Sequence, residues 1–527
     1  MSYSKKEKYT GALIGAAIGD ALGWPNEQNS KNISKNKNSI RTYVEWNRRA
    51  GGRYWPHEEK ICVGEYSDDT QLIIATARSL LRGRQWSNFF RQAELPAWLK
   101  YERGGGGATK RAAQKWADNI SPWDEKSNSP LEIKDYFMAG GNGVAMRIIP
   151  HIFKNEENIE KIMAQVVLNG MYTHGHPRAL IGAMLYAMAV RTLIQQDAVL
   201  SYGELIDVLI EEEKQWSELP EVSNIAIWKC EAERYAQYDY DQIWNECVLE
   251  TIDYLKIAKE ALNQGILDLG HDTLQKLGCY NSRINGAGNV SAVISIYLFS
   301  KYADDPVMAV YETANLNNAD TDTLASMVGG LVGALNGKDW IPIELRGVQD
   351  YSLFEYLIEQ MMDEKCDFLN SDKQYQLFNN EKMATLEIGD SIECLPFGEI
   401  TLKEIREDKP KRAGMYVKVY VWKTAYGQTI FSKKIGKKTL NMEQTIPHTV
   451  EKKHSPEIQF TVQKLKDIKK LLIKVSDAAD FVEILSEIVQ MKIDDDISKE
   501  KIDEMKVNRH AKIIELINKY HIETQEE

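Results

Sequence analysis

The sequence predicts a mainly α-helical protein with a small β-containing unit toward its C-terminus. Apolar segments rich in Gly and Ala recur through the first 370 residues, where strand-like alternation is scarce. From about residue 380 apolar and polar residues alternate with a period of 2, and after residue 455 the helical period of 3.6 returns. We therefore expect three parts: a compact all-helical domain over 1–370, a basic β unit over 380–450 and a helical segment over 451–527.

The overall composition is that of an ordinary globular protein. The chain has 527 residues, of which 43% are hydrophobic and 27% charged, which is enough for more than one domain. With 65 Lys and Arg against 77 acids its net charge is −12, which disfavours a chain that coats nucleic acid along its whole length. The six cysteines show no zinc-ligand spacing, and we find no secretory leader or membrane-length apolar run. These features predict a cytoplasmic protein with unpaired thiols and no membrane partner.

Small-residue helices are expected at the centre of the helical domain. Gly and Ala bury little area, but they let two helix backbones approach closely. Residues 205–265, which are more charged and richer in Trp and Glu, are typical of peripheral amphipathic helices. The first helix is expected to end near Gly23, because Pro25 cannot continue it, and this leaves Glu27 in a loop. The central helices are predicted over 11–23, 176–190, 290–302 and 324–335.

Residues 403–438 combine basic and aromatic side chains. They contain eleven Lys and Arg against three acids, and the alternation over 416–434 predicts a hairpin that turns at "TAYG". Basic charge with aromatic side chains on strands fits a nucleic acid or another acidic partner. The alternative, which we favour, is a small β core whose aromatic side chains are buried and whose lysines are solvated. The aromatic residues are Tyr416, Tyr420, Trp422, Tyr426 and Phe431.

Two acidic clusters precede apolar helices. Ser67 is a good N-cap, and Asp68 and Asp69 complement the positive end of a helix dipole. The second cluster, "DTDT" from Asp320 to Thr323, stands before another small-residue helix. One side-chain oxygen suffices for a cap, and two crowded carboxylates repel each other unless a proton or a cation neutralises them. If the two helix starts converge, their carboxylate and hydroxyl oxygens predict a site for two hard divalent cations.

Other candidate residues have competing interpretations. Asp20 fits a buried acid that accepts from nearby backbone, and Glu27 fits a solvated loop residue. The glycines around Asn142 permit positive φ and expose N–H groups to an anion, or they form a simple turn before a helix. The run Gly104–Gly107 is interpreted as a flexible connection, with a mobile lid as the alternative. His174 precedes a helix start, and such a histidine is more often structural than catalytic.

Five blocks of sequence, in this order, resemble the ADP-ribosylglycohydrolase family, which includes the dinitrogenase reductase-activating glycohydrolases and the ADP-ribosylhydrolases of animals. The match runs from about residue 8 to 345, and its blocks are "GALIGAAIGDALGWPNE", "YSDDTQ", "GNGVAMRIIP", "THGHPRALIGAML" and "NADTDTLASMVGGLVGAL". The resemblance implies an all-α domain with two divalent ions, Mg²⁺ or Mn²⁺, at the base of a cleft that holds ADP-ribose. The sequence departs from the family at Ser67, where Thr is usual, and at Asn318-Ala319, where Gly-Gly is usual.

The same resemblance implies roles for individual residues. Glu27, Asp69 and Asp322 would be catalytic, with Glu27 acting at the metal site or on the attacking water. The metal ligands would be Ser67, Asp68, Asp69, Asp320, Asp322 and Thr323. The residues that bind the phosphate and ribose of the ligand, or lie at its rim, would be Gly141, Asn142, Gly143, Met146, Arg147 and His174.

The expected function is hydrolysis that removes ADP-ribose from a modified protein or nucleic acid and releases free ADP-ribose. A glycosidic bond at ribose C1 breaks through an oxocarbenium-like transition state, so the site must position water and stabilise charge. Two alternatives stay open: a non-catalytic sensor of ADP-ribose or a related nucleotide, and a hydrolase of a small ADP-ribose derivative. Residues 380–527 lie outside the resemblance, which therefore implies nothing about their role.

Overall fold

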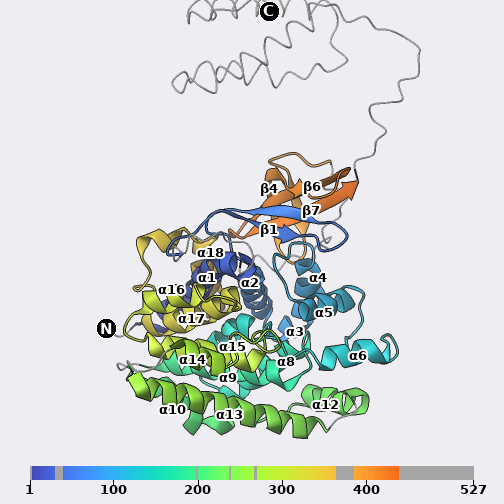
Figure 1. Cartoon of the computed structure of the whole chain (residues 1–527). Coiled ribbons are helices and arrows are strands. Elements are labelled where there is room, and N and C mark those ends of the chain that lie inside the picture. The colour runs from blue at the N-terminus through green and yellow to red at the C-terminus, as the bar shows by residue number, and fades with distance from the viewer. Residues whose placement is uncertain are drawn as a thin grey trace, which may run out of the picture. The chain divides into compact units, whose positions relative to one another are not determined.

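Helices make up most of the protein, and antiparallel strands lie at one end of the helical part (Figure 1). This arrangement confirms the predicted fold of a mainly α protein with a β unit, although "all-α" is too narrow a description of the chain. The computed structural model describes residues 3–29, 40–196, 200–236, 239–265, 270–363 and 385–437. The helical segment predicted over 451–527 lies outside these residues. The predicted domain boundaries stay a prediction, while residues 1–440 form one compact unit.

The helices and strands have the following bounds. The α-helices are α1 (Lys5–Asn29), α2 (Asp68–Leu80), α3 (Trp86–Phe89), α4 (Leu95–Trp98), α5 (Gly107–Ala117), α6 (Pro130–Phe137), α7 (Ile149–Asn155), α8 (Ile159–Met171), α9 (Pro177–Gln195), α10 (Glu204–Glu211), α11 (Glu213–Ser217), α12 (Ser223–Ala236), α13 (Tyr240–Gln264), α14 (Gly270–Lys276), α15 (Gly288–Lys301), α16 (Pro306–Ala314), α17 (Thr321–Asn336) and α18 (Tyr351–Asp363). Short 3₁₀ or π turns cover Gly83–Gln85, Phe90–Glu94, Ala145–Arg147 and Ile343–Gly347. The strands are β1 (Trp46–Ala50), β2 (His57–Ile61), β3 (Ser391–Cys394), β4 (Gly398–Glu407), β5 (Lys409–Pro410), β6 (Met415–Thr424) and β7 (Thr429–Lys437).

The closest helix pair is α1 with α17. Glycines four residues apart on α1 face small residues four apart on α17, so the two backbones touch directly. A Cβ atom at Gly15 would overlap the carbonyl of Gly329, and one at Gly19 would overlap the carbonyl of Ala325. Only glycine permits this approach, which fixes the end of α1 beside the start of α17.

The first helix does not end at Gly23, as the sequence analysis expected. It continues through Pro25 to Asn29, so Glu27 lies in its last turns instead of in a loop. The contact with α17 continues to this end, where the Thr321 hydroxyl donates to the Gly23 carbonyl at 2.8 Å. Tertiary packing therefore supports the turn that the proline would otherwise end.

The remaining central helices follow the prediction. α9 packs against α15 and α8, and its buried face includes nearly every residue from Ala179 to Ile194. Among the described helices only α9 is long and apolar enough to cross a bilayer, and 83% of its apolar window is buried inside the protein. The helices α10 to α13 cover the outside of this layer, as expected for residues 205–265 (Figure 1).

The strands form two sheets. The β1–β2 hairpin, which the sequence analysis did not anticipate, turns through Gly51 and Gly52 at positive φ and pairs with β5. The second sheet has the order β3-β4-β6-β7, and β6 and β7 form the predicted hairpin with Lys423 opposite Thr429. Burial of Tyr420, Trp422 and Phe431 agrees with the favoured interpretation of a β core. The expectation that its lysines are solvated is wrong for Lys433, which pairs with the buried Glu59 at 2.8 Å.

The α1–α17 contact gives a first prediction. Gly19→Ala places a Cβ on the backbone of Ala325 and is expected to lower the free energy of unfolding by about 1–3 kcal/mol. Urea denaturation of the full chain measures this change. The control is Gly347→Ala, where a Cβ meets no other atom within 4 Å and stability should stay within about 0.5 kcal/mol. Equal stability of the two variants would contradict the packing argument.

Candidate functional site

Three carboxylates converge where α1 ends and α17 begins. One oxygen from each of Glu27, Asp320 and Asp322 lies within 4.8 Å of the others. Asp320 stands at the N-cap of α17, but its side chain makes no capping hydrogen bond, and the Asp322 carboxylate accepts from the Thr323 N–H at 2.9 Å. Capping of α17 therefore does not explain why "DTDT" carries two acids, which agrees with the sequence analysis.

The start of α2 supplies the second acidic segment. Ser67 is the N-cap, and its hydroxyl accepts from the Asp69 N–H at 3.3 Å, which confirms the predicted cap. Asp20, fully buried on α1, accepts from the Ser67 N–H at 2.9 Å and from the Thr70 N–H at 3.0 Å. The interpretation of Asp20 as a buried acid satisfied by backbone is therefore confirmed, and this acid fastens α2 to α1.

The two segments meet through Asp69. The Thr323 hydroxyl donates to Asp69 Oδ2 at 3.3 Å, and the Ser67 hydroxyl lies 3.4 Å from the same oxygen. Residues 254 positions apart in sequence therefore share one oxygen. The other oxygen, Asp69 Oδ1, is buried and has no hydrogen-bond partner among the described residues.

Burial and mutual repulsion disfavour the charged form of these acids. Burial, reinforced by neighbouring carboxylates, raises the pKa of Asp68, Asp69 and Asp322 well above the usual aspartate range. For Asp322 the largest of these neighbours is Glu27, and for Asp69 it is Asp20. A cation placed among them would remove the repulsion that raises each pKa.

The donor set fits hard divalent cations. It offers carboxylate and hydroxyl oxygens from three helix ends, which is the chemistry that Mg²⁺, Mn²⁺ and Ca²⁺ select. The unpartnered Asp69 Oδ1 is a buried acceptor that a cation would satisfy. The acids that could hold such an ion together are Glu27, Asp320 and Asp322, and Asp69 joins them through the Thr323 hydroxyl. Ser67 and Asp68 stay predicted ligands at the start of α2.

The glycine loop after Ala139 lies against this site. Gly141 and Ala287 form a β-bridge, and the Asn142 N–H donates to the Gly286 carbonyl at 2.9 Å. The Asn142 side-chain amide donates to Asp320 Oδ2 at 2.7 Å. Asn142 therefore joins the predicted ligand loop to the acidic cluster.

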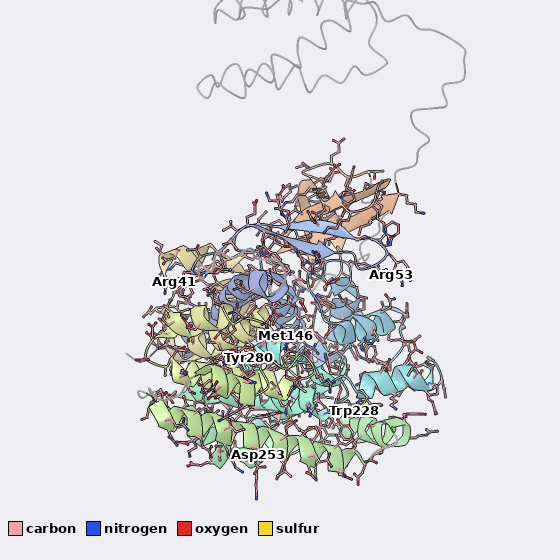
Figure 2. All side chains as sticks on the ribbon, in the orientation of Figure 1. Arg41, Arg53, Met146, Trp228, Asp253 and Tyr280 are labelled. Carbon is pink, nitrogen blue, oxygen red and sulfur yellow. The ribbon has the colours of Figure 1, made fainter. Side chains whose placement is uncertain are left out.

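Arg147 and Met146 are buried in the protein interior. Arg147 is fully buried, and its guanidinium donates to the Gly143 carbonyl at 2.7 Å and to the side-chain and backbone oxygens of Asn169 at 2.8 and 2.9 Å. Burial lowers the pKa of Arg147 to about 9. Met146 is 4% exposed and lies among the central helices (Figure 2). Arg147 thus stabilises the loop from the protein interior, an orientation that its sequence motif does not indicate.

His174 packs beneath the same loop. It is 2% exposed, its Nδ1 lies 2.8 Å from the Thr173 hydroxyl, and a Cβ at Gly143 would sit 3.0 Å from its ring. Burial, with Arg147 and Arg111 nearby, lowers the pKa of His174 to about 3, which makes the ring neutral at pH 7. The neutral imidazole therefore packs against the loop and leaves little room for a side chain at position 143.

Glu102 is an additional acid that the motifs did not indicate. Its Oε2 accepts from the N–H groups of Gly104 and Gly105 at 3.2 and 3.1 Å. Among the neighbouring charges, the Glu102 carboxylate contributes most to raising the pKa of Asp68. A Cβ at Gly104, whose φ is +118°, would lie 2.9 Å from Asp68 Oδ1. The sequence signal near Glu102 was the glycine run, and its last residue, Gly107, begins α5. Whether the run is a flexible connection or a mobile lid stays a prediction.

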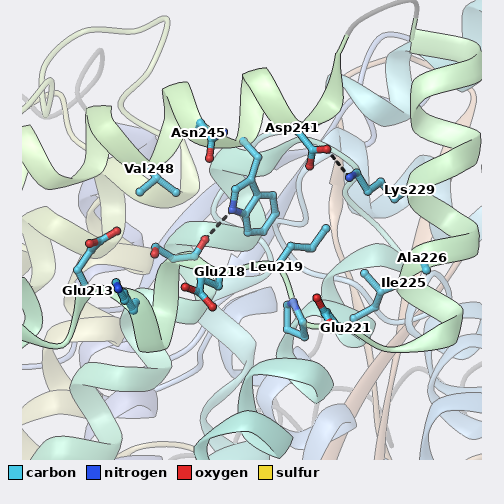
Figure 3. A pocket seen from close by; sticks show the side chains of 14 residues that line it. Glu213, Glu218, Leu219, Glu221, Ile225, Ala226, Lys229, Asp241, Asn245 and Val248 are labelled. Carbon is cyan, nitrogen blue, oxygen red and sulfur yellow. Dashed lines mark hydrogen bonds and ion pairs between the residues drawn. The ribbon is translucent and has the colours of Figure 1, made fainter.

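One prominent cavity lies away from these acids. It has a volume of about 630 Å³ between α11, α12 and α13, and the Trp244 indole on its wall donates to the Ser217 carbonyl (Figure 3). Its lining contains none of the predicted site residues. The convergence of acids, and not cavity size, therefore identifies the candidate site.

The fold and the site together define a class of protein. It is mainly helical, and its carboxylates cluster where α1 ends and where α17 and α2 begin. The model of the family described as ADP-ribosylglycohydrolase matches residues 1–374, and the chain belongs to this family. Membership supports hydrolase activity on ADP-ribose compounds, and members of the family depend on metal ions.

Individual relatives are distant. "Uncharacterized protein YegU" of Escherichia coli strain K12 is 24% identical, over 66% of this chain and 92% of its own length. "ADP-ribosylhydrolase ARH3" of Gallus gallus is 23% identical, over 64% of this chain and 87% of its own length. A solved structure titled "ADP-ribosylglycohydrolase-related protein complex" matches with a TM-score of 0.42 and 18% identity, over 69% of this chain and 99% of its own.

The setting of Arg147 gives a second prediction. Arg147→Lys keeps the positive charge but loses the planar donors that reach Gly143 and Asn169, so the free energy of unfolding should fall by roughly 2–4 kcal/mol. Urea denaturation measures the change, with the exposed Arg283→Lys as the control. Unchanged stability combined with weaker ADP-ribose binding would instead assign Arg147 to ligand recognition.

Proposed function

We propose that this chain is a metal-dependent hydrolase that removes ADP-ribose from a modified macromolecule by cleaving the glycosidic bond at ribose C1. The observation that carries the proposal is the contact of two acidic helix starts through Asp69 and Thr323, where Asp69 Oδ1 has no hydrogen-bond partner in the described part of the chain. Family membership supports hydrolase activity on ADP-ribose compounds, and the oxygen donors support the metal requirement.

The six oxygen-bearing residues of the two helix starts would hold two divalent ions. Mg²⁺ is the first candidate and Mn²⁺ the second, because both prefer carboxylate and hydroxyl oxygens. When bound, such ions orient ribose hydroxyls, polarise water and offset the negative charge of the acids. Ser67 and Thr323 contribute hydroxyls, so the serine that replaces the usual threonine keeps the ligand type.

Glu27 is proposed as the general base. Its carboxylate lies within 4.8 Å of those of Asp320 and Asp322, which places it at the edge of the cluster on the last turns of α1. In the proposed step Glu27 takes a proton from the attacking water as the C1–oxygen bond forms. The bond from C1 to the modified residue or base breaks, and the proton that Glu27 accepted passes to the leaving group.

The loop from Gly141 to Arg147 is proposed to bind the phosphate and ribose part of the ligand. Asn142 fixes the loop to Asp320, and Arg147 fixes the Gly143 carbonyl from the opposite side. These contacts preorganise the loop, which lowers the entropy lost when a ligand binds. His174 and Met146 would act through the loop's shape, because both are buried.

Two alternatives remain as outcomes of the test. A sensor without turnover would need no general base or complete ligand set, so the retained oxygen donors favour hydrolysis. A hydrolase of a small ADP-ribose derivative would use the same site. A panel of ADP-ribosyl-Arg, -Ser, -Asp/Glu and -nucleotide substrates separates these cases and identifies the linkage.

Asp322→Asn gives a third prediction. Loss of one carboxylate charge at the centre of the cluster should reduce ADP-ribose release by at least about 100-fold, since the site would hold a divalent ion poorly. Release of free ADP-ribose from the best substrate of the panel is measured with Mg²⁺, with Mn²⁺ and with a chelator.

The matched control is Asp253→Asn, an exposed aspartate of α13 at the surface of the protein (Figure 2). It should release ADP-ribose at the wild-type rate. Full activity of Asp322→Asn, or activity that survives complete chelation, would refute the metal-dependent mechanism.

A further inference from the structure

Strands beyond the family match contact each segment that brings an acid to the α2 side of the site. The match ends at residue 374, and β3, β4, β6 and β7 follow it. We infer that this sheet positions the Glu65–Asp69 segment and the Glu102–Gly104 turn, so that it is part of the catalytic scaffold. As far as activity is concerned, the inference rests on the proposed function.

The first contact holds the residues immediately before Ser67. The buried carboxylate of Asp350 accepts from the Tyr66 hydroxyl at 2.9 Å. It also accepts from the N–H and the hydroxyl of Thr429 on β7, both at 2.7 Å. Arg406 on β4 donates to Glu65 Oε1 at 3.0 Å. The sheet thus holds Glu65 and Tyr66, the two residues that precede the N-cap, Ser67.

The second contact holds α2 itself. Arg78, fully buried on this helix, is paired through two hydrogen bonds with Glu94 at 2.6 and 2.7 Å. Its remaining nitrogen donates to the Tyr426 hydroxyl at 2.8 Å and to the Gln428 side chain, both in the β6–β7 turn. A buried guanidinium is costly unless acceptors pair with its N–H donors. The placement of α2, the helix that starts with Asp68, therefore depends on the β6–β7 turn.

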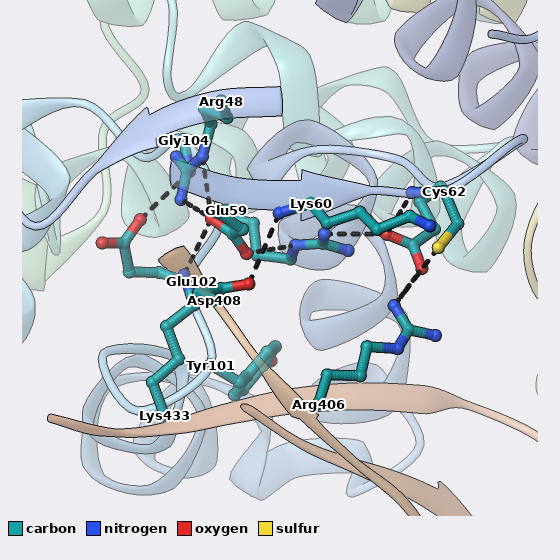
Figure 4. A network of polar contacts seen from close by, with 12 residues as sticks. Arg48, Glu59, Lys60, Cys62, Tyr101, Glu102, Gly104, Arg406, Asp408 and Lys433 are labelled. Atoms are coloured by element: carbon teal, nitrogen blue, oxygen red, sulfur yellow. Dashed lines mark hydrogen bonds and ion pairs between the residues drawn. The ribbon is translucent and has the colours of Figure 1, made fainter. Parts of the chain in front are cut away.

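The third contact is a buried charge network around Glu59 (Figure 4). Glu59 pairs with Arg48 at 2.9 Å, with Arg103 at 3.0 Å and with Lys433 of β7 at 2.8 Å. Burial alone would raise the pKa of Glu59, but these three cations hold it well below the usual range. The Arg103 guanidinium also lies 4.1 Å from the centre of the Phe431 ring on β7.

Arg103 transmits this network to the acids. It directly precedes Gly104, where a Cβ would lie 2.9 Å from Asp68 Oδ1, and it follows Glu102, whose Oε2 accepts from the Gly104 N–H at 3.2 Å. Its Nη2 also donates to Glu65 Oε2 at 2.7 Å, which ties the turn to the segment before Ser67. Glu59, Arg78 and Arg103 are each at most 1% exposed, so without the sheet these charges would lose buried partners.

The test uses two variants of the full chain. Lys433→Met removes a cation from Glu59, and Arg406→Met removes a partner of Glu65, while both leave an unbranched apolar side chain in place of the cation. Amide hydrogen exchange, followed by mass spectrometry without added metal, should speed up at least about threefold over residues 100–105 in Lys433→Met and over 64–70 in Arg406→Met. Exchange in α9 should stay unchanged, which distinguishes a local effect from global destabilisation.

Controls fix the interpretation. Lys437→Met, at the exposed end of β7, should exchange as wild type, and Lys433→Arg, which keeps a cation beside Glu59, should restore native exchange over 100–105. If one methionine variant does not fold, the other still decides. Wild-type exchange in both target segments of the folded variants overturns the inference.

ADP-ribose release by the same proteins tests the link to catalysis. In Lys433→Met we expect kcat to fall at least about tenfold while KM changes less than about threefold, because the acids and not the ligand loop are displaced. Faster exchange with unchanged kcat would overturn the catalytic part of the inference. If wild type releases no ADP-ribose, the proposed function fails, while the exchange experiment still tests the positioning.

Discussion

The contact between the backbones of α1 and α17 is the constraint on which the site depends. Glycines at 11, 15, 19 and 23 of α1 place its backbone against α17, where any Cβ would overlap a carbonyl group. This register brings Glu27 at the end of one helix beside Asp320 and Asp322 at the start of the other. A wider separation of the two helices would move these carboxylates apart, so the glycines determine the geometry of the acidic cluster as well as the helix packing.

The site concentrates negative charge that the fold alone does not neutralise. Asp20 uses its carboxylate to cap α2, yet Asp69 Oδ1 has no described partner and Asp320 caps nothing. Helix N-termini offset part of this charge, but burial and repulsion still raise the pKa of Asp322. A local departure from stable packing is typical of a functional site, and here a divalent cation would relieve it.

The basic strands that follow the family match are complementary to acids of the helical part. Arg406, Lys411, Lys423 and Lys433 each form an ion pair with a carboxylate from residues 58–350, so much of the sheet's positive charge is used within the chain. The aromatic residues on the same strands fill a core or support buried cations. This pairing explains how a strongly basic segment coexists with a net charge of −12.

Local sequence determined the central helices, the Ser67 cap, the β6–β7 hairpin and the identity of the acids, because periodicity, capping and turn residues act over a few positions. Even the α1 glycines, four apart, indicated close packing. Only tertiary structure decided which acids meet, since Asp69 and Thr323 are joined through helix packing across 254 positions. It also carried α1 past Pro25 and turned Arg147 inward, toward acceptors that no local pattern reveals. The physical reason is that side-chain direction and helix ends depend on partners distant in sequence, and those partners exist only once the chain has folded.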